Sequence, residues 1–131
     1  MVLLVGLALA AGTVMAQGRR DAGRHEYQSH CASCHGPSGK GDGPVFKYLV
    51  QPPTDLTTLA KRNGGVFPSL RVAESIDGRG STQIGPHGTR EMPVWGTVFR
   101  APDGAGRGDA ERRARRRMVA LLDYLSRIQE K

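Results

Sequence analysis

Apolar residues recur with a helical period in the C-terminal part of the chain. Six of them fall on one stripe: Ala114, Met118, Leu121, Leu122, Leu125 and Ile128. The opposite face is basic, with Arg112, Arg113, Arg115, Arg116 and Arg117. Asp109 is a residue type that favours the N-cap position of a helix. The pattern therefore predicts an amphipathic helix that begins at Asp109 and packs its apolar stripe against a core.

The earlier part of the chain predicts shorter helices joined by turns. Residues 19–30 are polar and contain no β-branched residue, which favours a helix just before Cys31. Asp55 to Ala60 and Pro68 to Ile76 are two more predicted short helices, the second ending before Asp77-Gly78. The pattern contains no repeat and no sign of a second domain.

The first residues follow another pattern. They are apolar from Val2 to Ala11 and then small, and Val14-Met15-Ala16 is similar to a signal peptidase site before Gln17. We predict a signal peptide over residues 1–16 and one domain over residues 17–131, exported to a bacterial periplasm. No basic residue precedes the apolar run, so an uncleaved membrane anchor and a buried core helix remain alternatives.

Composition points to a small domain with little apolar material for a core. The chain has 131 residues, of which 38% are hydrophobic, and includes 18 glycines and 8 prolines. A large buried cofactor would compensate for such a thin core. The net charge of +7 is compatible with an acidic redox partner, anionic lipid or nucleic acid. We do not expect nucleic acid, because the arginines have no aromatic platform or DNA-binding motif beside them.

Both cysteines of the chain lie in one short segment, HCASCHG, residues 30–36. Cys-x-x-Cys-His is the attachment sequence of a c-type haem. Cys31 and Cys34 are three positions apart, so a helix places both thiols on one face, where they can bond to one porphyrin. His35 then faces the iron. We therefore favour one covalently attached haem.

Two other interpretations of this segment stay open. A thioredoxin-like dithiol centre needs a preceding strand and a βαβ context, and neither is visible in the sequence. Structural zinc usually takes a second pair of ligands, which only scattered histidines could supply here.

An iron with one histidine ligand needs a second axial ligand, and Met92 in REMPVWG is the preferred candidate. Met92 precedes Pro93, and a residue before proline is pushed towards extended geometry, which holds the thioether on a loop. Met118 falls on the apolar helical stripe, where core packing is the default role. The rival ligands are His25, His30 and His87, and an open site is a further alternative.

Over roughly Arg20 to Glu130 the chain resembles the class I monohaem c-type cytochromes. The resemblance rests on YQSHCASCHGPSGKGDGP, PPTDLTTLA, NGGVFPSLRVAESIDGR, HGTREMPVWG and a C-terminal helix containing LLDYL. It implies an all-α cytochrome c fold, with short helices around the haem and crossing N- and C-terminal helices. Gly23 matches the small residue that lets those helices approach, and Tyr124 and Leu125 match its opposing contact.

The resemblance also implies further cofactor contacts. Pro44 would present its carbonyl to Nδ1 of His35 and so orient the ring. Trp95 is similar to the family residue whose indole serves a haem propionate. Arg79 and Arg90 are candidates for charge beside the propionates, with His87 as a weaker donor.

Histidine and methionine ligation leaves no vacant position for a substrate and raises the reduction potential, so the expected function is transfer of single electrons. The expected partners are redox proteins with acidic docking surfaces, while membrane contact is not required. We do not expect an enzyme, because the acidic residues are scattered and no hydrolytic triad is visible. The alternatives are a haem-containing subunit of a larger oxidoreductase and a haem enzyme in which Met92 leaves the iron.

Overall fold

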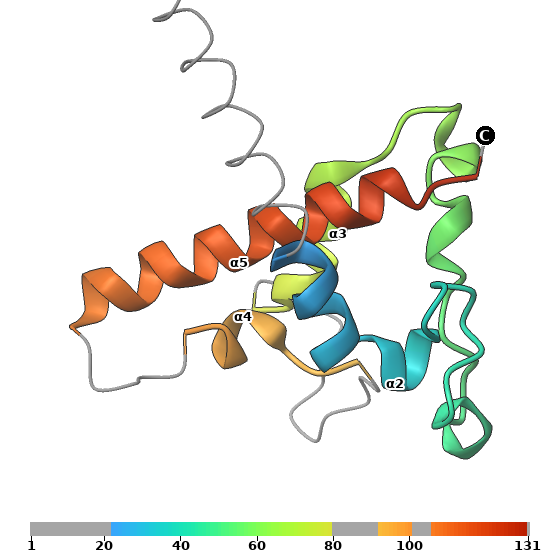
Figure 1. The fold of residues 1–131 in the computed structure, drawn as a ribbon, viewed down its shortest axis with the longest axis horizontal. Coiled ribbons are helices and arrows are strands. Elements are labelled where there is room, and N and C mark those ends of the chain that lie inside the picture. Colours follow the sequence, from blue (N-terminus) through green and yellow to red (C-terminus); the bar gives the residue numbers. More distant parts are fainter. Residues whose placement is uncertain (1–21, 80–91, 101–105, 131) are drawn as a thin grey trace, which may run out of the picture.

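The computed structural model describes residues 22–79, 92–100 and 106–130, and within these ranges every regular element is a helix (Figure 1). The N-terminal helix spans residues 22–30, and the elements after it are α2 (Ala32–His35), η1 (Phe46–Tyr48), η2 (Leu56–Thr58), η3 (Lys61–Asn63), α3 (Ser69–Asp77), α4 (Trp95–Val98) and α5 (Arg107–Arg127). The η elements are single turns of 3-10 helix. The predicted all-α fold is confirmed.

The boundaries of α5 and α3 differ from those the sequence predicted. α5 begins at Arg107 with Gly106 as its N-cap, so Asp109 lies in the first turn, where its carboxylate still complements the helix dipole. α3 begins at Ser69 with Pro68 as its N-cap, and it ends at Asp77, one residue later than predicted, with Gly78 as its C-cap. Gly78 has φ of 68°, a left-handed conformation that glycine adopts without strain.

The predicted crossing of the N-terminal helix and α5 is present (Figure 1). A Cβ atom on Gly23 would lie 2.1 Å from the carbonyl oxygen of Ala120 and 3.0 Å from Cβ of Tyr124, so only glycine permits this approach. One turn on, the rings of Tyr27 and Tyr124 lie 5.0 Å apart between centroids. The expected contact of Gly23 with Tyr124 is therefore present, whereas the nearest opposing atoms belong to Ala120 and not to Leu125.

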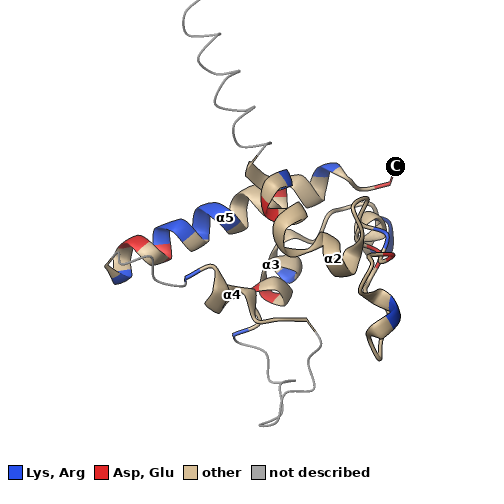
Figure 2. Ribbon diagram, turned by 60° about the horizontal axis from the view of Figure 1, so that its bottom comes forward, with Lys and Arg blue, Asp and Glu red and all other residues tan. Residues whose placement is uncertain are grey.

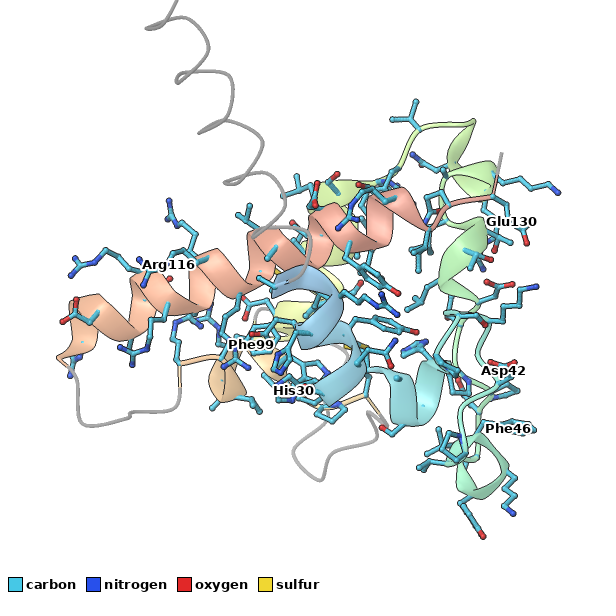
Figure 3. All side chains as sticks on the ribbon, in the orientation of Figure 1. His30, Asp42, Phe46, Phe99, Arg116 and Glu130 are labelled. Atoms are coloured by element: carbon cyan, nitrogen blue, oxygen red, sulfur yellow. The ribbon has the colours of Figure 1, made fainter. Side chains whose placement is uncertain are left out.

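An ion pair joins the same two helices. Arg117 of α5 donates from Nε to Glu26 at 2.9 Å and from Nη2 to Nε2 of His30 at 3.0 Å. Its guanidinium also lies over the ring of Phe99, 4.4 Å from the centroid. Figure 3 shows His30 and Phe99 facing one another beside this crossing. Arg117 therefore stabilises the packing of the two helices and does not belong to the exposed basic residues of α5.

The core forms where α3, α4 and α5 meet the N-terminal helix. Its buried members are Tyr27, Val72, Ile76, Phe99, Ala114, Leu121 and Leu125. The stripe predicted for the C-terminal helix thus faces the core, with Met118, Leu122 and Ile128 packed against it. Figure 2 shows basic residues gathered along the N-terminal half of α5. Among the five predicted basic residues, Arg112, Arg115 and Arg116 are exposed, whereas Arg113 and Arg117 are half-buried.

The end of the chain fastens the loop that carries η2. The side-chain oxygen of Gln129 accepts a hydrogen bond from the Ala60 N–H at 2.9 Å, and the Glu130 N–H donates to the carbonyl of Thr57 at 2.8 Å. Asp55 caps η2 by accepting from the Thr57 N–H at 2.8 Å. The helix predicted from Asp55 is therefore a single 3-10 turn. It is held by its own N-cap, Asp55, and by the hydrogen bond from Glu130.

Several predictions concern residues outside the described ranges. These are the signal peptide over residues 1–16, Arg90 and His87. No helix within residues 22–79, 92–100 or 106–130 is long and apolar enough to cross a bilayer.

Candidate functional site

The two cysteines and the histidine of the HCASCHG segment lie on one helical turn. The Cys31 N–H donates to the carbonyl of Tyr27 at 2.8 Å, and the His35 N–H donates to the carbonyl of Cys31 at 2.9 Å. The turn therefore continues directly from the N-terminal helix. Its hydrogen bond to Tyr27, a buried core residue, fixes its position relative to the core. Both thiols are free and half-buried in the structure. Burial, with smaller effects from Glu26 and Cys34, raises the pKa of the Cys31 thiol to about 12, so the thiol is neutral.

His35 is oriented by a carbonyl that the sequence did not predict. Its Nδ1 lies 2.9 Å from the carbonyl oxygen of Thr54, so Nδ1–H donates and Nε2 keeps its lone pair for a ligand. The structure thus places the carbonyl of Thr54 at Nδ1, where the carbonyl of Pro44 was expected. Pro44 leads into η1, which packs on α2, whereas the fastened loop before η2 brings Thr54 to the ring. Burial lowers the pKa of His35 and the bond to Thr54 partly opposes this, which favours the neutral ring that can bind a metal.

A cavity of about 380 Å³ opens beside this turn and lies within the roughly 300–1,000 Å³ range of ligand sites. Cys31, His35 and Met92 all line it, although Met92 is far from the other two in sequence. Its apolar lining consists of Tyr27, Leu56, Leu59, Pro68, Val72, Ile76, Leu121 and Leu125. The fold therefore brings an imidazole and a thioether to one largely apolar space.

The polar lining of the cavity consists of Thr54, Arg62, Asn63, Arg71 and Ser75. Arg62 also donates to the carbonyl of Asp55 at 2.8 Å, while Arg71 lies on α3 next to the core residue Val72. Two guanidinium groups at an apolar cavity suit a ligand that is mostly apolar but carries carboxylates.

Neither Arg79 nor Trp95 lines this cavity. The guanidinium of Arg79 is paired with Asp77, with Nη2 at 2.6 Å from Oδ2. Trp95 packs against His30 and Phe99, with centroid distances of 5.3 Å and 6.0 Å. The structure therefore does not bring these two residues to the cavity lining, and their role beside the propionates stays a prediction.

Arg62, Asn63 and Arg71 were missed by the sequence reasoning. One signal was available for Arg71: Pro68, Arg71, Val72, Ser75 and Ile76 have the spacing of a single helix face, and all five line the cavity. No comparable pattern marks Arg62, Asn63 or Thr54. Arg62 and Asn63 lie on the single turn η3 and Thr54 lies on the loop before η2, and both segments are too short to show a periodic pattern.

The alternative ligands are placed elsewhere in the described part of the chain. His25 is exposed, and His30 is engaged with Arg117. The described residues contain no group of three or more His, Cys, Asp or Glu side chains able to hold a metal ion, which removes the support for a zinc site among them. They also contain no strand to form the βαβ context of a thioredoxin-like centre.

The residues of the site fit a haem on chemical grounds. Two thiols lie on one turn, a neutral imidazole and a thioether line one apolar cavity, and two arginines could face carboxylates. Tyr27 and Leu121, both fully buried, close the cavity on the side of the helix crossing.

Comparison with known protein families gives a match over most of the chain. Residues 18–105 match the family described as cytochrome c oxidase, cbb3-type, subunit III. The matched segment covers more than half of the chain and contains Cys31, Cys34, His35 and Met92. No curated protein matches the chain significantly, and no solved structure does so either.

Proposed function

Since the chain belongs to the family described as cytochrome c oxidase, cbb3-type, subunit III, and is thus a cytochrome c domain, we propose that it carries single electrons through one haem bonded to Cys31 and Cys34. We assign His35 and Met92 as the axial ligands. One observation carries the assignment: among residues 22–79, 92–100 and 106–130, His35 supplies the only imidazole and Met92 the only thioether that line the cavity.

The roles of the protein groups follow from the site. The haem supplies the one-electron chemistry when it is bound. The Thr54 carbonyl holds the His35 ring in one tautomer and increases its donor strength. The apolar walls exclude water, and a thioether ligand in such surroundings favours the reduced state and a high potential.

The mass of the mature protein tests the proposal. The protein produced with its haem-attachment machinery is expected to weigh one haem more than its amino acids, and Cys31→Ser/Cys34→Ser is expected to lose that increment completely. Ser33→Ala is the control, because Ser33 is exposed between the two cysteines and should keep the haem. A wild-type mass equal to the polypeptide alone would overturn the proposal.

We further propose that Arg71 faces a propionate in place of Arg79. Removing a positive charge beside the haem favours the oxidised form, so Arg71→Gln is expected to lower the reduction potential by on the order of 20–60 mV. Arg116→Gln removes the same charge from an exposed position that points away from the body of the protein, and should have a smaller effect (Figure 3). Equal potentials for the two variants would contradict the role of Arg71.

A role as a subunit is the second candidate function, favoured by the description of the matching family, which names a subunit of an oxidase. Co-purification of the protein with a catalytic subunit would support it over a freely diffusing carrier. A haem enzyme remains the alternative if peroxide turns over at an iron that Met92 releases.

We propose a periplasmic location, with residues 1–16 as the export signal, and redox proteins as partners. Arg112, Arg115 and Arg116 are exposed residues of α5. They belong to its N-terminal half, where basic residues gather (Figure 2). We call these three residues the basic face. Cavity residues Leu121 and Leu125 lie further along the helix on its buried face. The basic face is therefore suited to attracting an acidic partner rather than to positioning it directly at the haem.

A further inference from the structure

Two ion pairs flank α4, the one-turn helix that follows Met92. Asp77, the last residue of α3, binds Arg79, with Oδ2 at 2.6 Å from Nη2. Arg100, just beyond α4, binds Glu111 of α5, with Nη2 at 2.9 Å from Oε1. We refer to Asp77, Arg79, Arg100 and Glu111 as the α4 clamp.

The α4 clamp contacts the backbone of α4 directly. A Cβ atom on Gly96 would lie 1.7 Å from Oδ1 of Asp77 and 2.7 Å from Nε of Arg79, so the first ion pair rests against the helix. Arg100 donates from Nη1 to the carbonyl of Gly96 at 2.8 Å. A four-residue helix leaves such carbonyls without a partner of its own, so the guanidinium satisfies one of them.

Charge supports the same arrangement. Hydrogen bonds from Arg79 and Arg100 lower the pKa values of Asp77 and Glu111, and the carboxylates raise those of the two arginines. The two ion pairs also interact with each other, since the charge of Arg100 lowers the pKa of Asp77 and the charge of Arg79 lowers the pKa of Glu111. The four groups therefore act as one network across α3, α4 and α5.

The link from α4 to Met92 is short and stiff. Pro93 fixes one backbone angle next to Met92. The Trp95 N–H donates to the Pro93 carbonyl at 3.1 Å, and the Thr97 N–H donates to the Val94 carbonyl at 3.1 Å. A displacement of α4 would thus move the Met92 side chain relative to the cavity that it lines.

We propose that the α4 clamp is a set of positioning residues that hold α4 against α3 and α5 and so keep the Met92 thioether over the cavity. The inference rests on the proposed function, in which the sulfur of Met92 ligates the iron. Supporting contacts of this kind decide how firmly a ligand stays in place.

Competition by imidazole tests the clamp in the ferric holoprotein. Arg100→Gln and Asp77→Asn each weaken the hold on α4, so each is expected to bind imidazole roughly three- to tenfold more tightly than the wild type. Gly96→Ala displaces α4 without changing any charge and should have the same effect. Arg100→Lys keeps the charge, but an ammonium group lacks the planar guanidinium that binds Gly96 and Glu111 together. Its imidazole affinity should therefore stay close to that of Arg100→Gln.

Arg112→Gln is the matched control. It removes one arginine charge and one ion pair, to Asp109, from the exposed start of α5 without touching α4, so imidazole affinity should stay at the wild-type value. If the clamp variants bind imidazole as the wild type does while their unfolding midpoints fall, the network is only structural and the inference is wrong. A wild-type ferric protein without the far-red absorption band of methionine-ligated haem would instead overturn the ligation by Met92, and with it the clamp.

Discussion

Met92→Ala is expected to abolish the far-red absorption band of the ferric protein and to lower its reduction potential. The physical reason is the loss of a thioether ligand that favours ferrous iron. We expect the potential to fall by on the order of 0.1–0.3 V, a part of the roughly 0.8 V range that axial ligands span. The variant should also bind cyanide faster, because no protein ligand has to leave first. Absorption spectroscopy, redox titration and stopped-flow mixing measure the three effects.

Met118→Ala is the control for this experiment. Met118 is a half-buried methionine that packs on the core but does not line the cavity. Its loss should cost stability while leaving the band and the potential almost unchanged. A band that survives Met92→Ala would show that another residue occupies the axial position, and the ligand assignment would have to be withdrawn.

Gly23→Ala is expected to destabilise the protein, although alanine is the better helix former by about 1 kcal/mol. The new methyl group would lie 2.1 Å from the carbonyl oxygen of Ala120, so the N-terminal helix and α5 would have to separate. Overpacking of this kind costs about 1–3 kcal/mol. Because Leu121 of α5 also closes the cavity, the shift should weaken haem retention as well. Chemical denaturation of the holoprotein measures the loss.

Gly108→Ala provides the opposite result in the same protein. Gly108 is exposed in the first turn of α5, and its added Cβ would meet only Nη1 of Arg112, at 3.9 Å. Here the helix preference of alanine should act alone and stabilise the protein by up to about 1 kcal/mol. Ala120→Gly should not rescue Gly23→Ala, because the clashing atom belongs to the backbone. If Gly23→Ala were as stable as Gly108→Ala, the close approach would be excluded.

The amphipathic pattern was sufficient to predict most of α5 because helical periodicity is a property of neighbouring residues. Its stripe from Ala114 to Ile128 does face the core. The N-cap was missed because Asp109 is as suitable in a first turn as at a cap. The close contact at Gly23 was also predictable, but only through the family resemblance, since a glycine in a polar segment does not by itself reveal what lies opposite.

The side-chain partners in the site were less predictable. Trp95 was expected at a propionate, yet its ring packs against the rings of His30 and Phe99 and does not line the cavity. Arg79 was expected at the cofactor, yet a carboxylate two residues away in sequence takes up its guanidinium. In both cases several partners were chemically suitable, and the choice depended on which of them the packing of α3 and α4 brought within reach.

The sequence by itself determined that this chain is helical, that its two thiols and one histidine share a turn, and that Met92 is available on a segment before proline. These features depend on spacing along a few residues, which covalent geometry transmits directly. Only the tertiary structure decided that Thr54 and not Pro44 orients His35, and that Arg71 and not Arg79 reaches the cavity. Such contacts join segments far apart in the chain, and their geometry is fixed by the closure of loops onto a common core rather than by any local pattern.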